Sequence, residues 1–431
     1  MDLKKSTTVP MAIFLASFFF ANGLHTAWAG ANDKPNPPSQ ICVNNKCAAT
    51  PPSIAPVPAT GPHTIKWNPG HYMASGSVLY GGRTVALLQP EMDDINNQDA
   101  IVGYRVWVTW GQIETAKGVY DFSQLDAVLA RLKTQYNKPK RLVIGMWLYG
   151  QGAIGGDRDA RVLPLYIQND PAYGPSPIAG RYGWWGKNDN GKSTGMYAPA
   201  LYSQPVMDRF IAMVQAMGQH YDGDDYVEGF YVQENATIAQ AASAWKPADP
   251  AYSDTAWLTQ IERLLTAATA AFPHTSVIMA NSWFDRPPAT VALTEWFANN
   301  RIAPGSADSW GQTSLSAIGT SHLSDGIQVL FGTDQFGGVG DLRGKMRPMM
   351  DVQSAELLGP YFSKYGGPWT PLDIINAFNQ TYYASHAFWT HFFGNEGSYG
   401  VPVPDAAKWV NLAATCAAHP LTHTDYPGNY P

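Results

Sequence analysis

Two kinds of hydrophobic pattern take turns along the chain from residue 64 onward. Short runs of aromatic and β-branched residues, such as residues 142–149, are apolar throughout, which is typical of strands buried on both faces of a parallel sheet. Between these runs, apolar residues recur every three or four positions, as a helix with one buried face requires. One such face is made by Leu125, Val128, Leu129 and Leu132. The alternation predicts an α/β fold with a parallel sheet.

The strand-like runs can be placed in order along the chain. After a weak first run that ends at residues 71–73, they lie at residues 104–110, 142–149, 226–235, 276–280, 303–310, 327–331, 347–353 and 386–393. About eight strand–helix units over roughly 360 residues match a single (β/α)8 TIM barrel with long βα loops. A doubly wound sheet is the competing fold, but no G-x-G-x-x-G turn follows an early strand. The TIM barrel is therefore the expected fold.

Three helix starts carry local signals. Ser123 with Asp126 three residues later predicts a capping box, and Thr370 with Asp373 predicts another helix cap. Pro205 stands where the first turn of a helix favours proline.

The first 62 residues differ from the rest. Residues 1–29 are typical of a signal peptide, with Lys4 and Lys5 ahead of a short apolar core and with Ala27-Trp28-Ala29 as the cleavage site. Residues 30–62 are rich in proline, asparagine, alanine and serine, which predicts a linker. The barrel is expected to occupy residues 63–431, in a protein that is secreted or periplasmic.

Export implies an oxidising compartment, where the three cysteines matter. Cys42 and Cys47 are close enough in sequence to form a small disulfide loop, which would leave Cys416 buried in the last helix. A Cys42–Cys416 bond is the alternative, and the sequence does not choose between them.

Charge and composition indicate which kinds of partner the protein binds. The net charge is −6 and no basic run follows the N-terminus, so a nucleic acid partner is not expected. No apolar run of membrane-spanning length follows residue 30, so the mature chain is expected to have no membrane span. The chain holds 15 Trp, 22 Tyr and 17 Phe, more rings than a core alone explains, and aromatic rings stack well on the apolar faces of sugars.

Residues at the ends of the predicted strands are the candidates for chemistry, because a barrel carries its active site there. They are carboxylates, amides, aromatic residues and a histidine: Trp110, Trp147, Tyr149, Gln233, Glu234, Asn281, Trp283, Asp351, Glu356, Trp389 and His391. The chain has no G-x-S-x-G or H-E-x-x-H motif and no clustered metal-ligand spacing, so neither a metal nor another cofactor is expected. Paired carboxylates without a metal suit glycoside hydrolysis.

Glu234 is the strongest single candidate. The segment 226–235 predicts a buried strand that ends on this acid, which is a poor place for stability and a good place for catalysis. A solvated strand end is the competing interpretation of Glu234.

The second predicted strand–helix unit resembles a known group of enzymes. It reads Arg105, then Trp110-Gly111-Gln112-Ile113-Glu114, then Gly118-Val119-Tyr120-Asp121-Phe122-Ser123-Gln124-Leu125-Asp126. This run resembles the corresponding unit of the clan A glycoside hydrolases, especially β-galactosidase-type members. The resemblance implies a TIM barrel and a retaining mechanism, with an acid/base Glu ending strand four and a nucleophile Glu ending strand seven.

Carried over by position, the resemblance assigns the acid/base to Glu234 and the nucleophile to Glu356. It implies a sugar-binding amide before the acid/base, where this chain has Gln233 in place of the usual Asn, and a sugar platform at Trp389. Asp351 competes with Glu356 for the nucleophile. Glu114 is interpreted as structural, paired with a nearby Arg.

The leading hypothesis is a secreted retaining glycoside hydrolase that cleaves a β-linked oligo- or polysaccharide by double displacement. The alternative is a non-catalytic carbohydrate-binding protein on a degenerate barrel of the same kind, because Gln233 departs from the family pattern. In either case carbohydrate is the expected partner.

Overall fold

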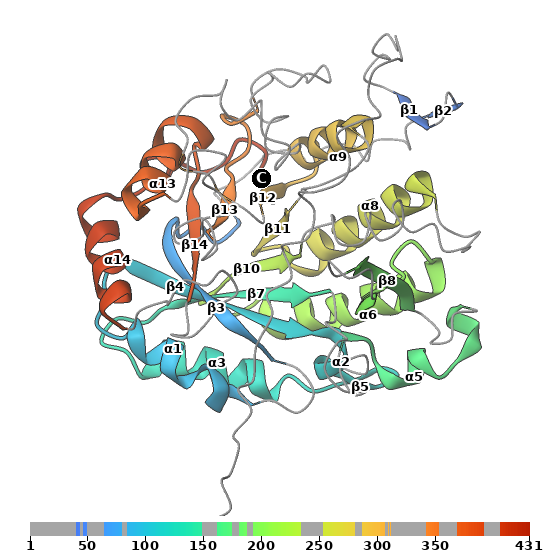
Figure 1. Cartoon of the computed structure of the whole chain (residues 1–431), viewed down its shortest axis with the longest axis horizontal. Coiled ribbons are helices and arrows are strands. Elements are labelled where there is room, and N and C mark those ends of the chain that lie inside the picture. The colour runs from blue at the N-terminus through green and yellow to red at the C-terminus, as the bar shows by residue number, and fades with distance from the viewer. Residues whose placement is uncertain are drawn as a thin grey trace, which may run out of the picture.

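The computed structural model describes residues 40–43, 46–49, 64–79, 84–148, 162–174, 181–187, 193–233, 253–280, 287–306, 309, 311, 342–352, 369–391 and 406–431. Eight parallel strands close into a barrel (Figure 1). In chain order they are β3 (Gly70–Leu79), β4 (Ile101–Thr109), β7 (Arg141–Trp147), β10 (Val227–Val232), β11 (Ser276–Ala280), β12 (Ile302–Ser306), β13 (Met349–Val352) and β14 (His386–Thr390). Each strand pairs with the next and β14 pairs with β3, so the expected TIM barrel is confirmed.

Helices surround the barrel (Figure 1). Those in the described part of the chain are α1 (Gln89–Asp94), α2 (Trp110–Ile113), α3 (Ser123–Thr134), α5 (Leu165–Gln168), α6 (Gln204–Tyr221), α8 (Asp254–Ala271), α9 (Pro287–Asn299), α13 (Pro371–Ala377) and α14 (Ala406–Ala418). Short 3-10 turns lie at Val85–Leu88 and Pro171–Tyr173, and a π-helical turn at Phe378–Tyr382. Among the described helices, none is long and apolar enough to cross a membrane.

Three small antiparallel hairpins lie outside the barrel. They are β1 (Gln40–Val43) with β2 (Lys46–Ala49), β5 (Glu114–Ala116) with β6 (Val119–Tyr120), and β8 (Arg181–Lys187) with β9 (Ser193–Pro199). The first hairpin sets Cys42 opposite Cys47, whereas Cys416 is a buried free thiol in α14.

Two apolar cores share the strands. The side chains that face the lumen form the smaller core, which includes Tyr72, Trp107, Tyr231, Ile278 and Phe388. The side chains that face outward form the larger core with the helices. Because both faces of each strand are covered, almost every strand position is buried.

Several local expectations are wrong, each for a structural reason. Trp110 begins α2 instead of ending β4, and its indole Nε1 donates to Glu114 Oε2 one helical turn on (2.7 Å). His71 lies near the start of β3, because the strand continues through an irregular, serine-containing stretch to Leu79. Ser123 is the first residue of α3 and not its cap, since its backbone N–H donates to Asp121 Oδ1.

Other local expectations are confirmed. Thr370 and Asp373 form the capping box of α13, and α6 has proline in its first turn. The buried face predicted for α3 is present as well. The predicted strand at residues 327–331 lies outside the described residues.

The amino-terminal end of the barrel is closed by a polar plug. Glu228 of β10 is buried and accepts hydrogen bonds from the backbone N and from Nδ2 of Asn68, each at 2.7 Å. Tyr72 Oη donates to the carbonyl of Asn68 (2.7 Å), and His386 Nε2 lies 3.4 Å from Glu228 Oε1. Trp67 covers this group edge-on to His386, and its indole donates to the carbonyl of Thr424 (2.7 Å).

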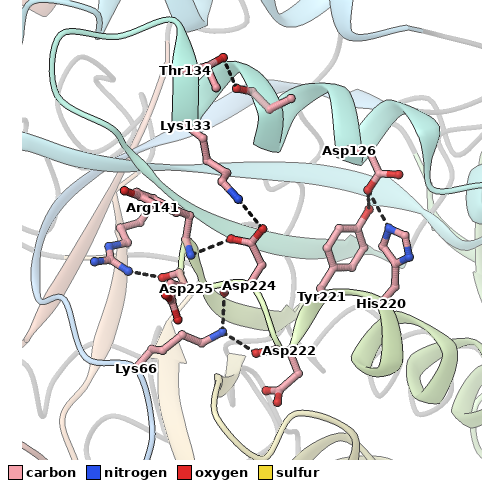
Figure 2. A network of polar contacts seen from close by, with 12 residues as sticks. Lys66, Asp126, Lys133, Thr134, Arg141, His220, Tyr221, Asp222, Asp224 and Asp225 are labelled. Carbon is pink, nitrogen blue, oxygen red and sulfur yellow. Dashed lines mark hydrogen bonds and ion pairs between the residues drawn. The ribbon is translucent and has the colours of Figure 1, made fainter.

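Charged side chains hold the turn that leads into β10 (Figure 2). Lys66 Nζ donates to the carbonyls of Asp222 (2.9 Å) and Asp224 (2.8 Å), and Lys133 Nζ pairs with the carboxylate of Asp224 (2.7 Å). Arg141 donates to the carbonyl of Asp225. The start of the fourth barrel strand is therefore fixed by cations from three separate segments.

Replacing Glu228 by alanine should lower the free energy of unfolding by about 3 kcal/mol, because two partly buried donors of Asn68 lose a charged acceptor. Urea-induced unfolding would measure the loss. The exposed Asp99, which pairs with Lys138 at the same end of the barrel, offers the control Asp99→Asn, for which little change is expected. Equal stability of Glu228→Ala and the wild type would contradict the plug.

Candidate functional site

The fourth and seventh barrel strands contact one another across the lumen. Tyr231 of β10 donates its hydroxyl to Asp351 Oδ2 of β13 at 2.6 Å, and both residues are buried. Each lies near the carboxyl end of its strand. The two strands from which the paired acids are expected therefore have facing ends.

Arg105 of β4 completes this contact. Its Nη1 contacts Asp351 Oδ1, so both oxygens of the carboxylate have protein donors. The guanidinium lies 4.2 Å from the ring centroid of Trp107, 4.8 Å from that of Tyr231 and 5.0 Å from that of Phe388. Attraction between the cation and three ring faces offsets part of the cost of burying the charge.

Burial raises the pKa of Asp351 above its usual value, and the contacts with Arg105 and Tyr231 act in the opposite direction. Two donors on an acid buried beside a cation favour its charged form. Asp351 thus has both a cationic partner, Arg105, and a hydrogen-bond donor, Tyr231, in the lumen just below the strand ends.

An aromatic path leads from this ion pair toward the strand ends. Trp147, the last residue of β7, is half-buried and packs edge-on against Trp107, with ring centroids 5.5 Å apart. Gly145 makes room for the Trp107 ring, because a Cβ at this position would lie 2.6 Å from Trp107 Cε3. Trp147 is the described candidate that best fits an accessible aromatic surface.

Gln233 follows β10 directly and precedes Glu234. Its side chain is almost fully buried, and its Oε1 accepts a hydrogen bond from the backbone N of Leu148 at 2.6 Å. The amide therefore connects the ends of the third and fourth barrel strands.

His391 follows β14 and is held from two sides. Its backbone N donates to the carbonyl of Ala74 (2.8 Å), and its Nε2 lies 2.8 Å from Asp94 Oδ2 in α1. Burial lowers the pKa of His391, against the influence of Asp94.

The sugar contacts expected of Trp110 and Trp389 need correction. Both side chains have no exposed surface. Trp110 packs on Phe210 of α6, and Trp389 donates its indole N–H to His71 Nδ1 (3.2 Å) on the helix side of the barrel wall. Lumen-facing and helix-facing residues alternate along a strand, and Trp389 follows the lumen residue Phe388.

The sequence matches no family model and no curated protein sequence. Solved structures do resemble the chain. A variant of GH5_18 from Streptomyces cattleya in complex with Manb1-4GlcNAc has a TM-score of 0.50 at 12% identity, over 81% of this chain and 80% of that one.

Two further structures resemble it at similar levels. The β-galactosidase from Bacillus circulans sp. alkalophilus has a TM-score of 0.49 at 12% identity, over 82% of this chain and 56% of that one. The catalytic domain of the β-amylase from Paenibacillus polymyxa has 0.47 at 11%, over 80% and 98%. Together with the closed barrel, the similarity to the GH5_18 structure shows a (β/α)8 barrel fold.

Glu114 has the structural role expected of it. It is fully buried as the first residue of β5, directly after α2, and it pairs with Arg209 of α6. Tyr166 of α5 also donates to it (2.9 Å), and so does the backbone N of Gly118 (2.8 Å). Glu114 thus fastens part of the long segment between β7 and α6 to the barrel.

Five of the candidates lie outside the described residues: Glu234, Glu356, Tyr149, Asn281 and Trp283. Among the residues that are described, no group of three or more His, Cys, Asp or Glu side chains is arranged to hold a metal ion.

Arg105 and Tyr231 were not predicted from the sequence as members of the site. A signal was present, since Arg105 and Asp351 are opposite charges within two strands predicted to be buried. Buried charges are usually paired, which would have predicted a contact between the second and seventh strands.

Replacing Arg105 by methionine should cost about 3–5 kcal/mol of unfolding free energy, because Asp351 stays buried without its cation. Urea-induced unfolding of Arg105→Met, Asp351→Asn and the double variant would measure this. The losses of unfolding free energy in the two single variants should add up to more than the loss in the double variant, and the difference is a coupling energy of about 0.5–3 kcal/mol. Strict additivity would argue against the pair.

Proposed function

We propose that this protein is a retaining glycoside hydrolase that cleaves a β-linked oligo- or polysaccharide. Glu234 serves as acid/base and Glu356 as nucleophile, with Asp351 as the competing nucleophile. The reaction needs two carboxyl groups about 5–5.5 Å apart on opposite sides of the scissile bond.

The contact between Tyr231 and Asp351 carries the proposal, because it joins strands four and seven across the lumen. Glu234 follows Tyr231 by three positions and Glu356 follows Asp351 by five. Along the chain, each acid thus comes after the carboxyl end of its strand, and barrels of this kind carry their active sites at the carboxyl ends of the strands.

The chemistry runs in two steps. Glu234 first protonates the leaving oxygen while the nucleophile attacks the anomeric carbon and forms a glycosyl-enzyme. Glu234 then takes a proton from water, which attacks the same carbon and releases the sugar with its configuration retained. Trp147 and the amide of Gln233 are proposed sugar contacts, and no cofactor takes part.

The proposed substrates are β-linked sugars. The GH5_18 structure is a complex with Manb1-4GlcNAc, and another structure of similar fold is a β-galactosidase. Aryl β-mannosides, β-galactosides and β-glucosides therefore form a sensible first panel, together with the matching β-1,4-linked oligosaccharides.

Glu234→Gln and Glu356→Gln should each lower kcat on the best aryl glycoside by about 10³-fold or more, because each removes a group that acts in the transition state. Circular dichroism would check that both variants fold, and Asp99→Asn at the opposite end of the barrel is the matched control. NMR of the first product should show the β anomer.

Full activity of Glu356→Gln together with an inactive Asp351→Asn would move the nucleophile to Asp351. Binding of a glycan with no product release by the wild type would instead support the carbohydrate-binding alternative. Activity in all three variants would overturn the mechanism.

We also propose that residues 1–29 are removed on export and that residues 30–62 link the mature N-terminus to the barrel. The mature chain should then begin at Gly30. N-terminal sequencing of exported protein from a signal-competent host would check this, and a retained Met1 would contradict it.

A further inference from the structure

The short helix α1 carries two acids that face different parts of the barrel. It follows β3 in the chain and precedes β4. Glu91 points into the protein and has no exposed surface, whereas Asp94 is partly exposed and faces His391. Neither acid has a role in the proposed reaction.

Glu91 is buried without a cation. Its Oε2 accepts a hydrogen bond from Tyr104 Oη of β4 (2.8 Å), and no ion pair to Glu91 occurs within the described ranges. Burial raises the pKa of Glu91 to about 8, although hydrogen bonds from Tyr104 and from Ser75, Gly76 and Ser77 of the neighbouring strand favour the charged form. Glu91 therefore keeps its proton at neutral pH.

The strand beside Glu91 is irregular. The register between β3 and β4 shifts between Ala74 and Val78, at the stretch that holds Ser75 and Ser77. Ser75 Oγ donates to the carbonyl of Ser77 (2.6 Å) and accepts from its backbone N (3.0 Å). Such a bulge is held by few ladder bonds, so it depends on the side chains that pack against it.

The other end of α1 reaches the last barrel strand. Asp94 Oδ2 lies 2.8 Å from His391 Nε2, and the backbone N of His391 donates to the carbonyl of Ala74 (2.8 Å) at the edge of the bulge. One short helix thus contacts the bulge of the first strand and the end of the eighth.

Other polar groups of α1 contact α3 and the residues that follow it. Asp93 pairs with Arg131 of α3 on the surface, and Gln89 accepts from the same guanidinium (2.7 Å). Tyr136, which follows α3, donates its hydroxyl to the carbonyl of Met92 (2.7 Å). The guanidinium of Arg131 thus contacts acceptors other than Glu91.

We propose that α1 is a pH-sensitive clamp, a helix that holds the carboxyl-terminal ends of β3 and β14 together. The helix stays in contact with both strands while Glu91 is protonated. Asp94 positions His391 within this contact. Ionisation of Glu91 leaves a buried charge with hydrogen-bond donors but no cation beside it among the described residues, and the helix relieves it by moving away from the bulge. His391, which is bound to both α1 and the bulge, is released in the same movement.

The direction of the pH effect follows from linkage. The pKa of Glu91 is about 8 in the folded protein, against an ordinary value of 4.5. Between these two values the folded state binds the additional proton, so stability is complete below the lower value and falls as pH rises toward the higher one. One such group changes the folding equilibrium constant by at most about tenfold per pH unit.

The decisive variant is Glu91→Gln, which keeps the shape and the acceptor for Tyr104 and cannot ionise. Thermal unfolding of full-length wild type and variant should be followed from pH 5 to pH 9. The wild type should lose stability relative to Glu91→Gln as pH rises, with the difference levelling off above pH 8. Asp93→Asn, which removes a surface acid of the same helix, should follow the wild type.

Hydrogen exchange tests the link to His391. At pH 9, peptides spanning residues 71–79 and 386–391 should exchange faster in the wild type than in Glu91→Gln, and the two proteins should agree at pH 6. Asp94→Asn should speed exchange at residues 386–391 at both pH values without removing the pH dependence of stability.

Parallel stability profiles of wild type and Glu91→Gln would overturn the proposal, as would exchange differences confined to other peptides. If Glu91→Gln does not fold, Tyr104→Phe replaces it: loss of the donor should deepen the alkaline loss of stability, and an unchanged profile would be contrary evidence. None of these measurements needs enzyme turnover, so they test the clamp independently of the proposed hydrolase activity.

Discussion

The contact of Arg105 and Tyr231 with Asp351 is the constraint on which the arrangement of the site depends. The three residues come from the second, fourth and seventh strands, none of which are neighbours in the barrel. A shift of one residue in any of these strands would turn its side chain out of the lumen. The buried charges are then unpaired, at a cost of several kcal/mol, so the pair specifies the register of the closed barrel.

The two ends of the barrel serve different purposes. At the amino-terminal end, Glu228 and Asn68 form a satisfied polar plug beneath Trp67, and the charges shown in Figure 2 hold the turn before β10. At the carboxyl-terminal end, the described residues include Trp147 and Gln233, which belong to the proposed site. Separating stability from chemistry in this way lets the loops at one end vary while the other end holds the fold.

Helix α1 places another buried acid, Glu91, on the outside of the barrel. Glu91 lies beside the stretch of β3 where the pairing with β4 shifts register, and burial raises the pKa of its carboxyl to about 8. The burial of an acid without a cation is unfavourable for stability at high pH, which sets it apart from Asp351 and Glu114, both of which have Arg partners.

Much of the fold was predictable from local pattern. The run at residues 142–149 became β7, and the capping pair Thr370 and Asp373 formed as expected, because both depend on residues close in sequence. The structural role of Glu114 was also foreseen. The sugar contacts predicted for Trp110 and Trp389 were wrong, because the sequence does not show whether an indole near a strand end faces the lumen or the helices.

The sequence by itself determined the alternation of strands and helices, and hence the barrel, because hydrophobic periodicity is a local property. The tertiary structure alone decided which face of each strand looks into the lumen and which charges meet there. Strands covered on both sides are apolar at nearly every position, so the twofold period that marks a face is hidden. Only closure of the barrel set Arg105 against Asp351 and turned Trp389 away.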